Sequence, residues 1–133
     1  MNLPEGPFEP VELSPNSGDF GSMGLDVGDI NNDGHFDVFV SNMYSKAGNR
    51  IMDNLPAGFY DADIMRKLRR MVSGSEMYVA KADGSYSRVG KDLHLSKIGW
   101  GWGPRLVDLN NDGWLDLFST CGFISHDRDE PDG

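Results

Sequence analysis

Residues 29–40 of the chain read DINNDGHFDVFV, and residues 108–119 read DLNNDGWLDLFS. Both segments follow the pattern Asp-x-Asn-Asn-Asp-Gly-x-x-Asp, and the second copy starts at residue 108 where the first starts at 29, a shift of 79 residues. An internal repeat is the first feature to interpret, because repeated units set the architecture of a chain. The sequence is therefore organised around a duplicated, aspartate-rich loop.

Short strands are predicted on both sides of each loop. The segments 24–28 and 103–107 lead into the loops, and the apolar residues 38–40 and 117–118 follow them. Segments this short and rich in β-branched and aromatic residues are typical of strands, so each loop connects a hairpin. A third strand pair is predicted at 76–81 and 85–89, because Asp83-Gly84 between them supplies the positive φ angles of a tight turn. The expected fold class is all-β.

One short inserted helix is predicted over residues 61–72, with carboxylates near its start. Its apolar residues follow helical spacing; they are Ile64, Met65, Leu68, Met71 and Val72. The basic residues among 66–70 are interpreted as the solvated face of this helix, with an anionic docking patch as the alternative.

Oxygen-bearing side chains occupy positions 1, 3, 5 and 9 of each loop, and glycine at position 6 allows a sharp turn. Hard oxygen ligands of this kind suit Ca²⁺, so the sequence predicts two calcium sites. The predicted side-chain ligands are Asp29, Asn31, Asp33 and Asp37 in the first loop and Asp108, Asn110, Asp112 and Asp116 in the second. The backbone carbonyls of His35 and Trp114 are predicted to add a further oxygen to each site.

Two other interpretations of these loops fit the sequence less well. Asn, Asp and Gly favour turns without any metal, but two full nine-residue matches are more than turn chemistry requires. An EF-hand loop starts in the same way but ends in a glutamate and is flanked by helices. Position 12 is Val40 in one loop and Ser119 in the other, and strand-forming residues follow, so the EF-hand is rejected.

Charge and composition exclude several partners. The formal net charge of −9 argues against nucleic acid, because phosphate binding needs a basic surface. No apolar run approaches a membrane span, and residues 1–12 lack the pattern of a signal peptide. The single cysteine, Cys121, excludes a disulfide within the chain, and we expect it to be buried.

The segments 24–40 and 103–118 resemble FG-GAP/VCBS repeats, as in the β-propellers of integrin α-subunits. The stretches 40–45, 47–51, 99–103 and 121–123 also resemble the bacterial branch of this family that is associated with ASPIC/UnbV modules. The resemblance implies a calcium-binding β-propeller in a secreted, periplasmic or cell-surface protein. A propeller blade of about 40–50 residues plus the inserted helix accounts for most of the 79 residues between the starts of the two loops.

About two blades are present, whereas a propeller closes with roughly four to eight. The expected organisation is an N-terminal extension (1–19), a first repeat with the helical insertion (20–98), the start of a second repeat (99–124) and a polar tail or linker (125–133). The remaining surface must then be covered by further blades or by another protein subunit.

The predicted function is a non-catalytic calcium-binding module for binding or scaffolding. The alternatives are a fragment of a calcium-dependent polysaccharide-active lyase and a structural subunit of a larger complex. No catalytic pair stands apart from the predicted calcium ligands. Carbohydrate is a conceivable partner, because Trp100 and Trp102 could stack on a sugar, although filling of space between blades is the preferred role for them.

Overall fold

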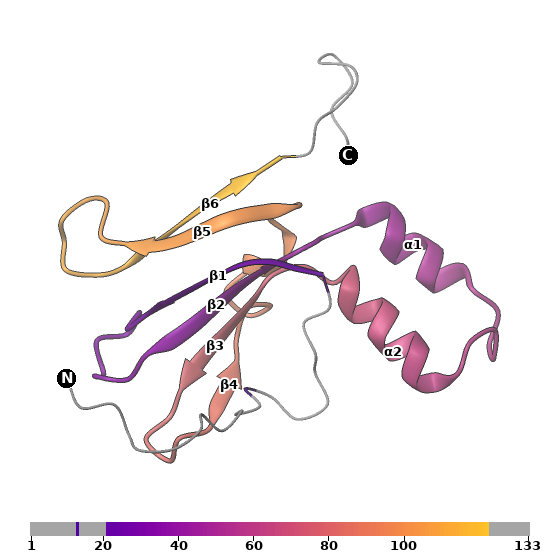
Figure 1. The fold of residues 1–133 in the computed structure, drawn as a ribbon, viewed down its shortest axis with the longest axis horizontal. Helices are drawn as coiled ribbons and strands as arrows, with labels where there is room; N and C mark the ends of the chain where they lie inside the picture. The colour runs from indigo at the N-terminus through magenta and orange to yellow at the C-terminus, as the bar shows by residue number, and fades with distance from the viewer. Residues whose placement is uncertain (1–12, 14–20, 123–133) are drawn as a thin grey trace, which may run out of the picture.

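The computed structural model describes residue 13 and residues 21–122, which form two antiparallel sheets and a helical hairpin (Figure 1). The elements in chain order are β1 (Ser22–Gly28), β2 (Asp37–Asn42), α1 (Lys46–Asn54), α2 (Ala62–Met71), β3 (Glu76–Ala80), β4 (Tyr86–Arg88), the 3₁₀ turn η1 (Leu95–Lys97), β5 (Gly101–Val107) and β6 (Asp116–Cys121). The larger sheet has the order β1-β2-β3-β4, and β5 pairs with β6 in the second.

The predicted strand hairpins are confirmed. The first aspartate-rich loop joins β1 to β2, the second joins β5 to β6, and the Asp83-Gly84 turn joins β3 to β4. Both sheets are open and antiparallel, and the described residues are mostly β-structure. This architecture agrees with partial blades of a propeller. The proposed domain boundaries stay a prediction, and the tail at 125–133 and all of the extension at 1–19 except residue 13 lie outside the described residues.

The prediction of a single inserted helix was wrong, because two helices connect β2 to β3. The predicted helix is α2, capped by the Asp61 carboxylate. The missed helix is α1, capped by the Ser45 hydroxyl, which accepts from the Gly48 N–H at 2.9 Å. Gly48 and Asn49 are poor helix formers, which is why the local sequence does not predict α1. Contacts with α2 supply the stabilisation: the Asn49 amide donates to the Val72 carbonyl at 2.8 Å.

The core lies around β2, whose six residues are all buried. Val38, Val40 and Tyr78 form the buried cluster, and Phe39 is fully buried as well. Strand β2 lies inside the larger sheet, paired with β1 on one edge and with β3 on the other.

The two sheets contact each other closely along β1 and β5. A Cβ atom at Gly24 would lie 2.6 Å from Cδ of Pro104, so only glycine allows this approach. The Asp26 carboxylate ties the sheets together: it accepts from the Leu106 N–H at 2.6 Å and pairs with Arg105 at 3.6 Å. These contacts dock the start of the second hairpin onto the first blade.

Cys121, at the end of β6, is exposed, so the expectation that it is buried was wrong. Strand β6 pairs only with β5 in the described part of the chain, and nothing there covers its other edge. No helix among the described residues is long and apolar enough to cross a membrane.

Candidate metal centre

The two aspartate-rich loops have the same backbone conformation. Asn32 and Gly34 have φ angles of 56° and 85°, and the equivalent Asn111 and Gly113 have 62° and 88°. A Cβ atom at either glycine would meet nothing within 4 Å. The positive φ, rather than crowding, therefore requires glycine at position 6 of the loop.

Hydrogen bonds draw the side chains at positions 1, 3 and 5 of the first loop together. The Asp29 carboxylate accepts from the N–H groups of Asp33 at 3.0 Å and Gly34 at 2.8 Å. The same Asp33 N–H also donates to Oδ1 of Asn31 at 3.1 Å. The Asn31 amide in turn donates to Oδ2 of Asp33 at 2.9 Å, and the His35 N–H donates to Oδ1 at 2.9 Å. Oxygens of Asp29 and Asn31 thus share the Asp33 N–H, and the Asp33 carboxylate is itself bonded to the Asn31 amide.

The second loop repeats these bonds one by one. Asp108 accepts from the N–H groups of Asp112 at 3.1 Å and Gly113 at 2.8 Å. Asn110 accepts from the Asp112 N–H at 3.0 Å, and its amide donates to Asp112 at 2.9 Å. The Trp114 N–H donates to Asp112 at 2.9 Å. Because every bond spans five residues or fewer, the nine-residue pattern alone is sufficient to produce this conformation.

The aspartates at position 9 differ between the loops. Asp37 is fully buried, and its two oxygens accept from the N–H groups of Ile30 at 2.9 Å and Ala80 at 2.8 Å. Asp116 is half-buried and accepts from the Leu109 N–H at 3.1 Å. The difference follows from the sheets, since β3 lies beside β2 while no third strand of the described residues lies beside β6. Asp37 therefore ties its loop to the body of the blade.

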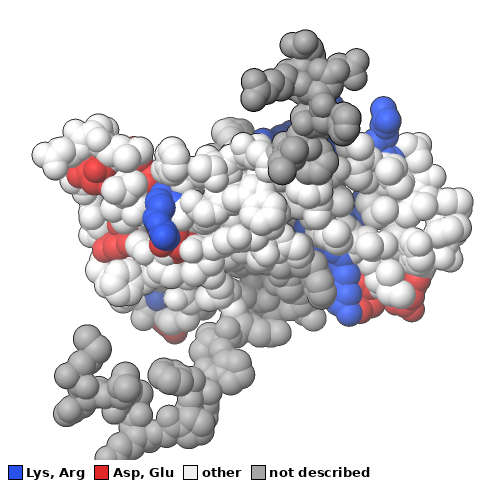
Figure 2. All heavy atoms as spheres, turned by 45° about the horizontal axis from the view of Figure 1, so that its top comes forward, with Lys and Arg blue, Asp and Glu red and all other residues white. Residues whose placement is uncertain are grey.

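The loops carry negative charge without a matching cation. Within the described residues, no Lys or Arg side chain forms an ion pair with the six loop aspartates. Hydrogen bonds from the His35 N–H and from Asn31 hold the pKa of Asp33 below its usual value, so this carboxyl is ionised at neutral pH. The loops also touch, because the Asn32 amide donates to the Gly113 carbonyl at 3.2 Å. Figure 2 shows acidic groups at the loop-bearing end of the molecule.

The donor set fits a hard cation, because every side chain at positions 1, 3, 5 and 9 offers oxygen. Among residues 21–122 and residue 13, no three His, Cys, Asp or Glu side chains are gathered as a metal cluster. One of the three converging side chains is an asparagine in each loop, and Asp37 is engaged by backbone N–H groups. The predicted ligand sets, including the carbonyls of His35 and Trp114, thus remain predictions.

The basic run at 66–70 is divided by the structure. Arg66 and Lys67 pair with Asp63, and Arg69 pairs with Asp53, all on the exposed side of the helical hairpin. Arg70 instead turns toward the buried carboxylate of Glu76, at 4.0 Å. Sequence spacing did not distinguish Arg70 from its neighbours, because the partner lies on a strand that the helix reaches only in the fold.

Open antiparallel sheets with paired aspartate-rich hairpins define a protein built from partial β-propeller blades. Residues 70–119 match the family model described as an FG-GAP-like repeat. The chain thus contains an FG-GAP-like repeat over residues 70–119, as the resemblance predicted, and the whole second loop lies inside this segment. No curated protein and no solved structure matches the chain significantly. FG-GAP repeats are generally non-catalytic structural modules and occur in extracellular or surface proteins. The narrower assignment to the ASPIC/UnbV-associated branch stays a prediction.

Proposed function

We propose that the chain is a non-catalytic, calcium-binding propeller module that serves binding or scaffolding in a secreted, periplasmic or surface protein. The observation that carries the proposal is the pair of loops with the same oxygen donors and the same hydrogen bonds, whose aspartates pair with no Lys or Arg side chain of the described residues. Turn formation alone would not need three carboxylates at each loop, because clustered carboxylates repel one another.

Calcium would be held first by the side chains at positions 1, 3 and 5, which already converge in both loops. These are Asp29, Asn31 and Asp33, and Asp108, Asn110 and Asp112. Asp37 and Asp116, at position 9, accept hydrogen bonds from backbone N–H groups of their own loops. Either carboxylate would bind calcium with an oxygen that keeps this hydrogen bond or gives it up. A bound cation neutralises the clustered charge, so the hairpin ends become rigid supports for neighbouring recognition loops.

The substitutions Asp33→Ala and Asp112→Ala are each expected to remove one of two calcium sites. Both side chains are exposed at the loop centres, so neither change should disturb the core. Isothermal titration should give two calcium ions for the parent chain and one for each variant. An unchanged stoichiometry in both variants would refute the assignment.

The control is Asp83→Ala, which removes an aspartate from the β3–β4 turn but from neither loop. It should leave the calcium stoichiometry at two.

Calcium at about 100 times its dissociation constant should add roughly 2.7 kcal/mol per independent site to the free energy of unfolding. Thermal unfolding with and without EDTA measures this term separately from the titration.

We also propose that further propeller blades or another protein subunit cover the apolar surface of this chain. Large side chains of β1, β5 and β6 are exposed, among them Leu25 (55%), Trp102 (47%) and Phe118 (50%). Phe39 of β2 does not belong to this surface, because it is fully buried. Trp102 does not fill space between the described sheets; its indole N–H donates to the Gly122 carbonyl at 2.8 Å.

The isolated chain is therefore expected to associate in calcium-containing buffer. Exposed apolar side chains along an unpaired sheet favour contact with a second surface. Light scattering at micromolar concentration should report species larger than a monomer. The double variant Leu25→Ser/Phe118→Ser should shift the distribution toward monomer, and a compact parent monomer that binds no apolar dye would contradict the proposal.

A further inference from the structure

The two loop-bearing hairpins repeat each other in strand register as well as in loop sequence. Residues 26–28 of β1 pair with β2 as residues 105–107 of β5 pair with β6, with both strands shifted by 79 residues. Phe39 of β2 thus has Phe118 of β6 as its equivalent. Because successive side chains of a strand point to opposite sides, each hairpin has two faces, and equivalent residues lie on equivalent faces.

The second hairpin packs onto one face of the first, along β1 and β5 (Figure 1). Pro104 approaches Gly24, and a Cβ atom at Gly28 would lie 3.4 Å from Cβ of Leu106. The face of the first hairpin that accepts these side chains is called the receiving face. Phe39 lies on it, because it pairs with Asp26 between the two glycines, and Phe39 is fully buried.

The receiving face of the second hairpin is exposed. Its residues are the equivalents of Asp26, Gly28 and Phe39, and they are Arg105, Val107 and Phe118. All three are exposed in the structure, in contrast to the buried Phe39. The same surface that the first hairpin covers within the chain is therefore open on the second.

The complementary half of this contact is also exposed, on the first hairpin. Pro104 and Leu106 are the side chains that β5 inserts against β1, and Pro104 is fully buried by this contact. Their equivalents on β1, which form the inserting face, are Leu25 and Val27, and both are exposed. The chain thus carries, on its two hairpins, both halves of a contact that it makes once within itself.

Charge supports the same contact between two copies of the chain. Within one chain, Asp26 on the receiving face pairs with Arg105 at 3.6 Å. On the second hairpin Arg105 takes the receiving-face position, and the residue that would meet it from a second copy is that copy's Asp26. The Arg105 side chain is 70% exposed and has five N–H donors, so it can pair with both carboxylates. The ion pair is reversed in direction and remains attractive.

We propose that a second copy of this chain docks on the second hairpin, inserting its Leu25 and Val27 against Arg105, Val107 and Phe118. This inference rests on the association proposed above and identifies the partner and the two surfaces involved. The contact is head-to-tail, because it joins two different surfaces. Repetition of such a contact gives a ring if the rotation closes and an open chain if it does not.

The contact between copies is weaker than the one within the chain, for two reasons. The Asp26 carboxylate accepts from the Leu106 N–H at 2.6 Å, whereas an arginine at position 105 offers no acceptor to the equivalent N–H of a second copy. Val107 also stands where Gly28 permits a close approach. Copies of the chain should therefore separate on dilution.

Two matched variants test the proposal. Phe118→Asp places a carboxylate on the receiving face and leaves the inserting face intact, and Leu25→Asp does the reverse; both residues are exposed. Each variant alone should associate at least tenfold more weakly than the parent in calcium-containing buffer. An equimolar mixture should form dimers and nothing larger, because the two chains together still offer one intact pair of faces. Sedimentation velocity measures all three samples.

Ile51→Asp is the control, because it adds the same charge at an exposed apolar residue of α1 that belongs to neither face. It should associate as the parent does, and an equal loss of association in this variant would overturn the proposal. Thermal unfolding shows whether each variant is folded, and Phe118→Ser and Leu25→Ser replace any aspartate variant that is not.

Two further results would overturn the head-to-tail contact while leaving association itself in place. One is a mixture that forms no dimer, and the other is parent-like association of either variant alone, which would show that only one of the two faces is used. A parent chain that stays monomeric would instead refute this contact together with the broader proposal of association.

Discussion

Replacing Asp37 with alanine is expected to destabilise the chain by about 2–5 kcal/mol, because each of two N–H groups that loses its acceptor in a buried setting costs roughly 1–3 kcal/mol. The fully buried Asp37 carboxylate accepts from Ile30 in its own loop and from Ala80 in β3. Losing it also separates the loop from the third strand of the blade. Removal of a buried, doubly bonded group is among the few mechanisms that produce effects this large.

Asp116→Ala is the matched control, because Asp116 occupies the same position in the second loop. It is half-buried and accepts from Leu109 alone among the described backbone groups, so we expect a loss of about 1 kcal/mol. Urea unfolding in EDTA measures both variants without any calcium contribution. Equal destabilisation of the two variants would show that burial and the bond to β3 contribute nothing to the role of Asp37.

Gly74→Ala is the second substitution with a large expected effect. Gly74 has a φ of +98°, and a Cβ atom there would lie 1.7 Å from the Ser96 carbonyl oxygen. A backbone atom held by the Ser75 N–H cannot move aside as a flexible side chain does. We expect a loss of at least about 3 kcal/mol, from the strained φ and from displacement of the segment 91–97.

Gly84→Ala is the control that measures backbone strain without a steric clash. Gly84 has a φ of +81°, and nothing lies within 4 Å of its Cβ position. It should cost about 1–2 kcal/mol, the penalty for a left-handed L-residue. Thermal or urea unfolding of the two variants provides the comparison. If Gly74→Ala lowered the free energy of unfolding no more than Gly84→Ala does, close packing of residue 74 against residue 96 would be refuted.

Much of the fold could be predicted from the sequence where the determining contacts are local. The hairpin at β3–β4 depends on the Asp83-Gly84 turn, where the Asp83 carboxylate accepts from the Ser85 N–H at 2.9 Å. Helix α2 was predicted because its capping residue and apolar spacing lie within its own segment. Helix α1 was missed because its stabilising bonds, such as Asn49 to Val72, cross 23 residues.

The loop conformation was determined by the sequence alone. The hydrogen bonds among positions 1, 3, 5, 6 and 7 of either loop join residues five or fewer positions apart, so the same nine-residue pattern produces the same geometry twice. A positive φ at Gly34 and Gly113 is likewise a property of one residue.

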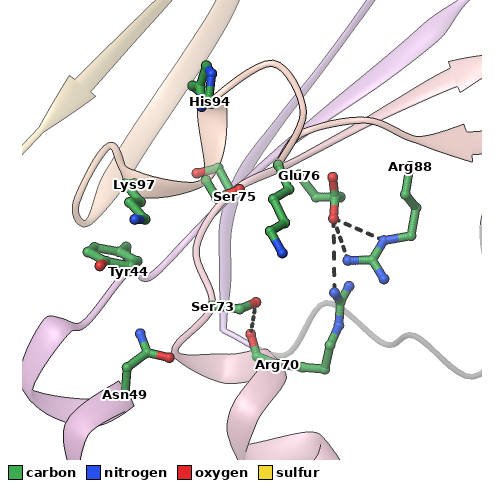
Figure 3. Close-up of a pocket in the computed structure, with 11 residues that line it drawn as sticks. Tyr44, Asn49, Arg70, Ser73, Ser75, Glu76, Arg88, His94 and Lys97 are labelled. Atoms are coloured by element: carbon green, nitrogen blue, oxygen red, sulfur yellow. Dashed lines mark hydrogen bonds and ion pairs between the residues drawn. The ribbon is translucent and has the colours of Figure 1, made fainter.

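Only the tertiary structure decided what distinguishes the two copies. Asp37 is buried because β3, 43 residues away at Ala80, supplies a donor to it, while Asp116 has no such strand beside it in the described residues. The ion pairs of Glu76 with Arg70 and Arg88 likewise require a helix and two strands to meet (Figure 3). Local sequence patterns do not predict these contacts, because burial and ion pairing depend on which distant segments the sheet register brings together.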